Sequence, residues 1–516
     1  MKTNVRWSMS LLLILATASF FVAPAQAQPI ELAEASITES DLITLNQYAA
    51  DTWRSFEAMT YRETGLPADN ISAEGVRSRF TSPTNIGVYI WSTLAARDLD
   101  IIEPGEARLR IRRVLDRLET MERHTDSGMF YNWYDPANGA KLTTWPPSGD
   151  PVYPFLSSVD NGWLAAALIM VTNTVPQLRD RAQAIVDSMD FGFYYDPVAG
   201  LIRGGFWDDL PPGCSILGNY RGRGPDVYYT CHHYGALNTE PRIASYIGIA
   251  KDGIPETHYF KMWRTFPPTC DWGWQEMSPQ GVTRTYLGVD VYEGHYTYSG
   301  MNIVPSWGGS MFEALMVPLL VPEEEWGPRS WGVNHPLYVE AQVEHGLEEA
   351  NYGYWGFSPS NDPAGGYREY GVDPIGLNPD GYTSDEERTT VDYGFLDPSG
   401  TFYCRPPQPL PETYGQGVVT PHASFLALDF APDAALQNLA NLRRDFESYS
   451  WGGFFDAVNV STGDVSTYYL ALDQGMIMAA IANEVRNNRL QHYFTRGVIE
   501  EVVKPLLAME EFTAGP

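Results

Sequence analysis

Four acidic residues stand in surroundings suited to acid–base chemistry: Asp160, Glu240, Glu293 and Glu313. Cleavage of a glycosidic bond generally requires two carboxyl groups, one to protonate the leaving oxygen and one to activate water or attack the sugar. Asp160, Glu240 and Glu313 also have a structural interpretation, because an acid near a helix start interacts favourably with free backbone N–H groups. The sequence leaves both interpretations open at these three positions.

The stretch 292–320 holds two of these acids, Glu293 and Glu313, among five aromatic residues and a histidine. Glu293 lies in an aromatic loop and could simply bind a sugar hydroxyl. Residues 306–320 have apolar side chains at helical spacing and Ser306 or Ser310 as a cap, which predicts a helix that is apolar nearly all round. Glu313 falls in its first turn.

The other acids belong to further predicted helices. Asp160 lies in the first turn of a helix over 157–175 that is apolar on almost every side. Glu240 opens a helix over 239–251, where a capping role or a salt bridge is the alternative. Asp473 lies inside an otherwise buried helix, where an unpaired charge would be costly, so a partner in the centre of the protein is expected.

Aromatic residues make up 13% of the chain, and many lie in polar loops rich in glycine and proline. Aromatic faces beside carboxylates suit sugar rings, which present apolar C–H patches together with hydroxyl groups. We therefore predict a set of sugar-binding residues: Trp133, Tyr134, Tyr292, His295, Trp307, Trp355 and Asp473.

The formal net charge is −30, from 34 basic and 64 acidic residues, and it argues against nucleic acid or an anionic membrane as partner. Motifs of serine hydrolases, zinc proteases, phosphate-binding loops and dinucleotide-binding folds are absent from the sequence. The adjacent His232 and His233 diverge and have no partner cluster at metal-ligand spacing. We expect neither a metal nor a cofactor.

The N-terminus has the pattern of a secretory signal peptide over residues 1–27: basic Lys2 and Arg6, an apolar run over 11–22, and a small-residue cleavage site at 25–27. No later stretch is apolar enough to span a membrane. These features predict a secreted or periplasmic protein.

Four cysteines are available for pairing in such an oxidising compartment, and four allow three connectivities. Pairing Cys214 with Cys231 would close a loop rich in glycine and proline.

Roughly a dozen helices, alternately buried and exposed, are predicted along the chain, among them helices over 465–485 and 488–507. Only short strand-like pieces lie between long aromatic loops. Six inner and six outer helices closed into a toroid would explain this alternation, so we expect an all-α (α/α)₆ barrel. A TIM barrel would need regularly repeated Val/Ile-rich strands, which the sequence lacks. No linker divides the chain, which predicts a single domain over 28–516.

Several phrases, in this order, resemble the glucoamylase-like exported bacterial proteins, which are related to endo-β-1,2-glucanases and to the transglycosylating domain of cyclic β-1,2-glucan synthases. The resemblance runs from about Ser40 to Asn488. The phrases are Ser82-Pro83-Thr84-Asn85-Ile86-Gly87, Tyr131-Asn132-Trp133-Tyr134-Asp135, Val159-Asp160-Asn161-Gly162, Ser306-Trp307-Gly308-Gly309-Ser310-Met311-Phe312-Glu313, Trp355-Gly356-Phe357-Ser358, Thr420-Pro421-His422-Ala423-Ser424 and Leu472-Asp473-Gln474-Gly475.

This resemblance implies an (α/α)₆ toroid and places Glu240 at the position of the general acid in members that act on β-1,2-glucan. The synthase domains carry a second glutamate in a WGISES-like phrase, where this chain has Pro359. Proline cannot act as a nucleophile. An inverting mechanism is therefore expected, with water activated by Asp160, Glu293 or a more distant acid.

The expected function is that of a secreted glycoside hydrolase acting on a glucan, with β-1,2-glucan or a related polysaccharide as the best candidate. Three alternatives remain open: a hydrolase of another cell-wall or environmental polysaccharide, a polysaccharide lyase, and a carbohydrate-binding toroid without activity. A lyase would need an acidic substrate and basic residues in its cleft, which the negative net charge disfavours.

Overall fold

A computed structural model describes residues 37–146, 148–269, 275–377, 394–397, 399–407 and 414–516 of the 516-residue chain. The predicted signal peptide lies outside these residues. The described part is rich in helices, and many short strands lie between them. None of its helices has the length and apolar character needed to cross a membrane.

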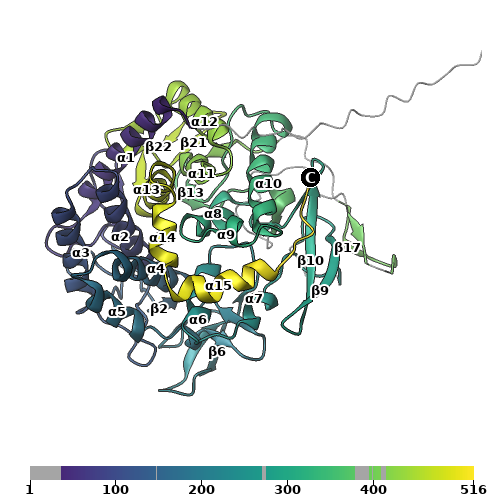
Figure 1. The fold of residues 1–516 in the computed structure, drawn as a ribbon, viewed down its shortest axis with the longest axis horizontal. Coiled ribbons are helices and arrows are strands. Elements are labelled where there is room, and N and C mark those ends of the chain that lie inside the picture. The colour runs from purple at the N-terminus through teal and green to yellow at the C-terminus, as the bar shows by residue number, and fades with distance from the viewer. Residues whose placement is uncertain (1–36, 147, 270–274, 378–393, 398, 408–413) are drawn as a thin grey trace, which may run out of the picture.

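The helices fall into an inner and an outer group, as Figure 1 shows. The inner helices are α2 (Pro83–Asp98), α4 (Ser158–Thr174), α6 (Arg242–Ala250), α8 (Met311–Leu315), α11 (Pro421–Leu426) and α13 (Ala471–Val485). Around them lie α1 (Glu39–Met59), α3 (Pro104–Leu118), α5 (Arg179–Ser188), α10 (Trp331–Glu344) and α12 (Pro432–Asp445). Shorter or terminal helices are α7 (Thr257–Lys261), α9 (Glu323–Trp326), α14 (Arg489–Thr495) and α15 (Val498–Met509).

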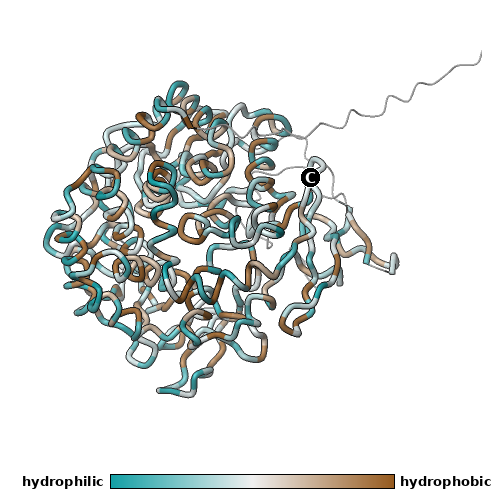
Figure 2. Tube along the Cα trace, viewed as in Figure 1, coloured by the Kyte–Doolittle hydropathy of each residue, from teal (hydrophilic) through white to brown (hydrophobic). Residues whose placement is uncertain are grey.

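The two groups differ in composition, as the sequence predicted. Most residues of α2, α4 and α13 are buried, whereas α3 and α5 bury one face and expose charged residues on the other. Figure 2 shows apolar segments concentrated towards the interior and hydrophilic segments common at the periphery. One continuous hydrophobic cluster includes buried residues from Leu45 to Phe512, so both ends of the described chain contribute to the same core.

Glycines allow the inner helices to approach closely. A Cβ atom on Gly87 of α2 would lie 2.8 Å from the carbonyl oxygen of Trp163 in α4, and one on Gly475 of α13 would lie 2.5 Å from the Cβ of Val88. Gly162 of α4 meets Ala244 of α6 in the same way, at 3.0 Å. These contacts link α13, α2, α4 and α6 in that order, and α11 packs beside both α13 and α8.

Capping residues fix where the inner helices begin. The hydroxyl of Ser157 accepts a hydrogen bond from the backbone N–H of Asp160, and Ser310 does the same for Glu313. The hydroxyl of Ser82 caps α2, with Pro83 at the first helical position. The caps therefore place Asp160 and Glu313 in the first turns of α4 and α8, as the sequence predicted.

The predicted aromatic loop around Glu293 is instead a β-hairpin. Strands β9 (Gln280–Tyr286) and β10 (Val289–Tyr298) pair antiparallel and place Glu293 opposite Val282. The turn between them has positive φ at Leu287 and Gly288, which suits a two-residue hairpin. Glu293 is buried on strand β10, so the predicted loop is wrong at this position.

Three predicted helices are shorter than expected. The segment 306–320 forms strand β12 (Ser306–Trp307), then α8, then a 3₁₀ turn over Val317–Leu319. Two strands precede α13 within 465–485, and the segment 488–507 is split where Gly497 adopts φ +93°. Helical periodicity detected the apolar face in each case but could not locate these backbone breaks.

The remaining strands form small sheets that connect and cover the helix ends. Strand β1 (Asn70–Ser72) pairs antiparallel with β23 (Tyr468–Leu470), which brings the segments before α2 and α13 together. The remaining strands are β1 (Asn70–Ser72), β2 (Phe155–Ser157), β3 (Tyr195–Asp196), β4 (Leu201–Arg203), β5 (Gly205–Trp207), β6 (Ser215–Gly218), β7 (Val227–Thr230), β8 (His233–Tyr234), β11 (Met301–Ile303), β13 (Ser360–Asn361), β14 (Tyr367–Arg368), β15 (Gly376–Leu377), β16 (Phe395–Leu396), β17 (Tyr403–Arg405), β18 (Val418–Val419), β19 (Tyr449–Ser450), β20 (Gly453–Phe454), β21 (Ala457–Asn459), β22 (Val465–Ser466) and β23 (Tyr468–Leu470).

A disulfide joins Cys214 to Cys231, which confirms the pairing suggested by the glycine- and proline-rich loop. It ties the loop before β6 to the end of β7. Cys404 is also disulfide-bonded, and no described cysteine is free.

The glycine contacts lead to a stability prediction. Replacing Gly87 by alanine forces a methyl group against the backbone of α4, so we expect the free energy of unfolding to fall by about 1–3 kcal/mol in denaturant titrations. Gly105 in the first turn of α3 has open space around it, and Gly105→Ala is the matched control. Its expected effect is neutral or stabilising, by up to about 1 kcal/mol. Equal losses in both variants would contradict this explanation.

Candidate active site

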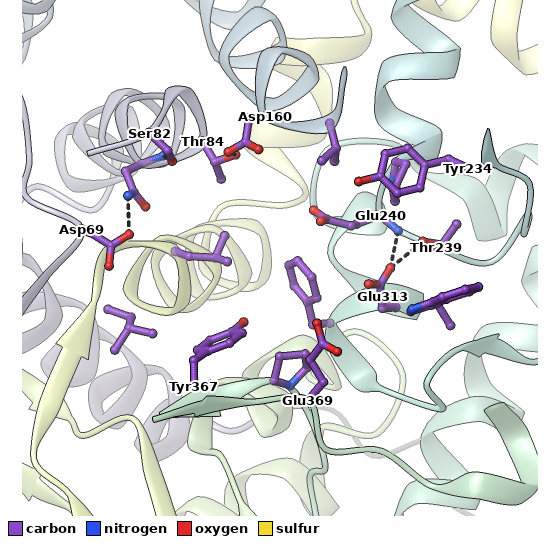
Figure 3. A pocket seen from close by; sticks show the side chains of 18 of the residues that line it. Asp69, Ser82, Thr84, Asp160, Tyr234, Thr239, Glu240, Glu313, Tyr367 and Glu369 are labelled. Atoms are coloured by element: carbon purple, nitrogen blue, oxygen red, sulfur yellow. Dashed lines mark hydrogen bonds between the residues drawn. The ribbon is translucent and has the colours of Figure 1, made fainter. Parts of the chain in front are cut away.

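A cavity of about 880 Å³ lies where several inner helices begin. Its walls come from the starts of α2, α4 and α8, the segment before α6, the hairpin β13–β14 and the junction of β23 with α13. Five acids line it: Asp69, Asp160, Glu240, Glu313 and Glu369. Figure 3 shows them distributed around the open space. No lysine or arginine is among the described residues that line this cavity.

Glu240 reaches the cavity from the residues just before α6, not from within the helix as predicted. Its Oε2 accepts a 2.6 Å hydrogen bond from the indole N–H of Trp163. Burial raises the pKa of the Glu240 carboxyl well above its usual value, and the nearby Glu313 raises it further. The cavity therefore favours the protonated form of Glu240.

Glu313 lies beside Glu240, although 73 residues separate them in the chain. One oxygen, Oε2, accepts hydrogen bonds from the backbone N–H of Glu240 (3.0 Å) and from the hydroxyl of Thr239 (2.5 Å). Burial raises the pKa of Glu313 to about 7, while these two donors act to lower it. The two donors therefore favour the ionised form, which burial opposes.

The buried guanidinium of Arg242 connects the segment that carries Glu240 to the helix that carries Glu313. Arg242 donates to the carbonyl oxygens of Thr239 (2.9 Å), Glu313 (3.1 Å) and Ala314 (2.6 Å). It also forms a two-bonded pair with Glu323, with both contacts at 2.8 Å and both side chains fully buried. Arg242 thus fixes the start of α6 against α8.

Asp160 and Asp69 occupy another part of the cavity (Figure 3). The hydroxyl of Thr84 donates a 2.6 Å hydrogen bond to Asp160, and the side-chain amide of Asn85 donates to Asp69 at 2.8 Å. Burial raises the pKa of both carboxyls. The antiparallel pairing of β1 with β23 positions Asp69, and no local pattern in the sequence indicated it.

Aromatic side chains line much of the remaining wall: Phe80, Trp133, Tyr234, Trp307, Phe312 and Tyr367. Trp133 packs against Phe80 and against Trp145, with ring centroids 5.5 and 5.1 Å away. Of the predicted sugar-binding residues, the structure thus brings Trp133 and Trp307 to the cavity. Sequence reasoning missed Tyr234, Tyr367 and Glu369, because the hairpin and short strands that present them have no periodic pattern.

Comparisons with known proteins agree with this architecture. The family described as "Putative glucoamylase" matches residues 279–497, and a family of unknown function, DUF3131, matches residues 47–193. The predicted resemblance to glucoamylase-like proteins is confirmed.

The chain is also similar to two curated proteins. One is the cyclic β-(1,2)-glucan synthase NdvB of Rhizobium meliloti, at 23% identity over 91% of this chain and 19% of the synthase. The other is an exo β-1,2-glucooligosaccharide sophorohydrolase of Parabacteroides distasonis, at 29% identity over 25% of this chain and 16% of the hydrolase. The chain therefore matches less than a fifth of the length of either relative.

Solved structures share the fold. An endo-β-1,2-glucanase from Chitinophaga pinensis, in complex with sophorotriose and glucose, matches 92% of this chain and 99% of its own, with a TM-score of 0.62 and 15% identity. A glucoamylase-like protein from Bacteroides fragilis, titled "putative glucoamylase", matches 92% and 98%, with a TM-score of 0.61 and 18% identity. At these identities the likeness shows the fold alone.

Glu293 is not among the residues that line the cavity. It is 1% exposed and lies 3.6 Å from the guanidinium of Arg264, which also pairs with Glu510 near the C-terminus. Burial raises the pKa of Glu293 to about 8 despite the nearby arginine. Because side chains alternate between the two faces of β10, the side chain of Glu293 points inward and is a buried structural group.

Four predicted sugar-binding residues also lie away from the cavity lining. Tyr134 and Trp355 are buried in the hydrophobic core, where the hydroxyl of Tyr134 donates to a backbone carbonyl. Tyr292 and His295 lie on β10 of the hairpin, and His295 contacts Thr513 at 2.7 Å. An aromatic residue in a polar segment therefore gave no reliable indication of the cavity, because short strands bury such residues.

Asp473 directly follows the cavity-lining residue Leu472 in the chain and is 4% exposed. It neighbours two other buried residues, His422 and Asp456, and one ligand-type atom of each lies within 4.8 Å of the others. Both ring nitrogens of His422 already contact hydroxyls, those of Thr420 and Ser358. Burial raises the pKa of Asp473 to about 6. The partner predicted for Asp473 in the centre of the protein is the cluster with His422 and Asp456.

The buried pair of Arg242 and Glu323 leads to a second stability prediction. Replacing Arg242 by methionine leaves Glu323 buried without its cation, so we expect the free energy of unfolding to fall by about 3–5 kcal/mol in denaturant titrations. Lys504→Met removes the exposed pair with Glu500 and serves as the control, with an expected change below about 0.5 kcal/mol. A loss from the arginine variant no larger than the control would refute the importance of this pair.

Proposed function

We propose that this protein is a secreted or periplasmic glycoside hydrolase that cleaves a glucan, with β-1,2-glucan as the best candidate. The observation that carries the proposal is the position of Glu240, a buried carboxyl group that favours its proton and faces a large cavity lined by aromatic residues and further acids. A protonated carboxyl in such a cavity can donate its proton to a leaving glycosidic oxygen.

Asp160 is the proposed base. Figure 3 shows the carboxyl groups of Asp160 and Glu240 facing the same open space from different elements, the start of α4 and the segment before α6. Burial raises the pKa of Asp160, while the hydroxyl of Thr84 stabilises its ionised form. An ionised Asp160 with a raised pKa is a stronger base towards water than an exposed carboxylate.

Inversion is the proposed stereochemical course. Pro359 lines the cavity at the position where the resemblance to the synthase domains places a glutamate. Proline offers no oxygen to attack the sugar, so the chain supplies no nucleophile there. Water activated by Asp160 would then attack the face opposite the departing group.

The proposed substrate class rests on chemistry and on the relatives. The cavity has aromatic faces for sugar rings and carboxyl groups for hydroxyls, and its described lining lacks the cations that an acidic sugar would need. The C. pinensis structure is named as an endo-β-1,2-glucanase and the P. distasonis relative as acting on β-1,2-glucooligosaccharides. A neutral β-1,2-glucan fits these observations better than a uronic acid polymer.

The proposal includes closure of the helices into an (α/α)₆ toroid. The packing order α13, α2, α4, α6 and the contacts of α11 with α8 and α13 support such a ring. In a ring of this kind the starts of the inner helices converge at one end, which would explain why acids from distant segments gather in one cavity.

Replacement of the proposed acid tests the function. We expect Glu240→Gln to lower the release of reducing sugar from β-1,2-glucan at least about a hundredfold, because an amide cannot donate the proton. Asp160→Asn should lower it similarly, while circular dichroism and melting temperature remain those of the wild type. Glu293→Gln is the control away from the cavity, and a loss confined to this control would refute the assignment.

The stereochemical course is testable by NMR. If water attacks directly, the first product of β-glucan cleavage carries an α-configured reducing end, which then equilibrates to the mixture of anomers. Proton NMR during the first minutes of the reaction should therefore show the α-anomer growing first. Initial formation of the β-anomer would require a covalent intermediate and would exclude the role proposed for Asp160.

A polysaccharide panel distinguishes the rival functions. A lyase would produce unsaturated ends that absorb in the near ultraviolet, and a binding protein would release nothing. Release of saturated oligosaccharides from another glucan, but not from β-1,2-glucan, would retain the hydrolase and change its substrate.

A further inference from the structure

We infer that Glu313 is a positioning residue that holds Glu240 in place and keeps it protonated. The inference rests on the proposed role of Glu240 as general acid. It gives Glu313 a task distinct from proton donation and water activation, the two catalytic tasks that the sequence left open for the four acids.

The contacts show why Glu313 is suited to this task. Its Oε2 accepts both the backbone N–H of Glu240 and the hydroxyl of Thr239, so one oxygen holds the backbone that carries the acid. Figure 3 shows both hydrogen bonds, with Glu313 beside Glu240 in the wall of the cavity. Two donors on one oxygen favour an ionised carboxylate, and an ionised neighbour favours a proton on Glu240.

The geometry of the pair is set by parts of the chain that do not touch the cavity. Arg242 joins the carbonyls of Thr239 and Glu313, and Glu323 anchors Arg242. Glu323 in turn accepts from the hydroxyl of Tyr246 at 2.7 Å and contacts His335 at 3.1 Å. This network keeps the two carboxyl groups adjacent despite their repulsion.

Other titratable and charged groups also face the pair from every packed element. Around Glu240 they are Asp160 on α4, Tyr234 on β8, Arg242 on α6 and Tyr367 on β14, and around Glu313 they are Arg242, Tyr234, Tyr338 on α10 and Glu369 after β14. After burial, Glu313 is the largest influence on the pKa of Glu240, and Asp160 is a smaller one of the same sign. Arg242 acts in the opposite direction on both glutamates.

The consequence is a shared titration. As the pH falls through about 7, Glu313 gains a proton, and its charge no longer acts on Glu240. As the pH rises, Glu313 is ionised and delays the loss of the proton from Glu240. Both glutamates therefore set the pH at which activity falls on the alkaline side. That pH is higher than it would be for Glu240 beside an uncharged neighbour.

The pH dependence of kcat/KM on β-1,2-glucan tests the inference, because it reports ionisations of the free enzyme. The amide oxygen of Glu313→Gln can still accept both hydrogen bonds, but the side chain carries no charge. We expect its alkaline limb to move to lower pH by about one unit or more, so that the activity ratio of variant to wild type falls as pH rises. An unmoved limb with activity reduced equally at every pH would show a merely structural role and overturn the inference.

Two further variants sharpen the result. Trp163→Phe removes the hydrogen-bond donor that stabilises ionised Glu240, so its limb should move in the opposite direction, to higher pH. Glu369→Gln removes another carboxyl group from the same cavity without touching the pair's hydrogen bonds, and its shift should be smaller than that of Glu313→Gln. An equal shift would attribute the effect to the general acidity of the cavity and overturn the inference.

Infrared spectroscopy separates this inference from the proposed function. The carboxyl C=O band of protonated Glu240, assigned by its loss in Glu240→Gln, should disappear at lower pH in Glu313→Gln than in the wild type. This shift supports the pairing even if the wild type cleaves no glucan, in which case only the proposed function fails. An unshifted band overturns the pairing whatever the activity.

Discussion

A buried cation holds the site together. Arg242 is fully enclosed, and its guanidinium satisfies backbone carbonyls on either side of the junction between the start of α6 and α8, while Glu323 neutralises its charge. An arginine can do this because its planar fork presents several donors in fixed directions, whereas a lysine ammonium could not reach all these acceptors at once. The cavity wall containing Glu240 and Glu313 depends on this interaction.

The cavity as a whole concentrates acids that water would otherwise solvate. Burial favours the neutral form of Glu240, Asp160 and Asp69 and raises the pKa of each. The unfolded chain gives up these protons at lower pH than the folded protein does, so each of these groups reduces folding stability as the pH rises above its unfolded pKa. The extensive core and the closely packed glycine contacts offset this cost elsewhere. The protonated acids of the cavity are thus supported by a hydrophobic core whose stability does not depend on their protonation.

Sequence reasoning succeeded where a local pattern carried the information. Apolar periodicity found the inner helices and placed Asp160 and Glu313 in first turns, a capping serine supported the position of Glu313, and the ordered phrases indicated the resemblance to glucoamylase-like proteins. It failed where short strands replaced loops. Glu293 looked like a cavity residue because its neighbours are aromatic and polar, yet alternation along β10 buries it beside Arg264. Asp69 was overlooked because its place at the cavity depends on β1 pairing with β23, whose sequence is some 400 residues away.

The sequence by itself determined the acidic charge, the aromatic content, the order of buried and exposed helices and the identity of Glu240 as a candidate acid. Only the tertiary structure decided which acids share a cavity, because two- and three-residue strands and isolated bridges bring their segments together with little periodic signal. It also decided that Glu313 binds the backbone of Glu240, since a hydrogen bond across 73 residues requires both helix starts to be packed on Arg242. Proton affinity follows from burial and neighbours, and both are properties of the folded chain rather than of any segment.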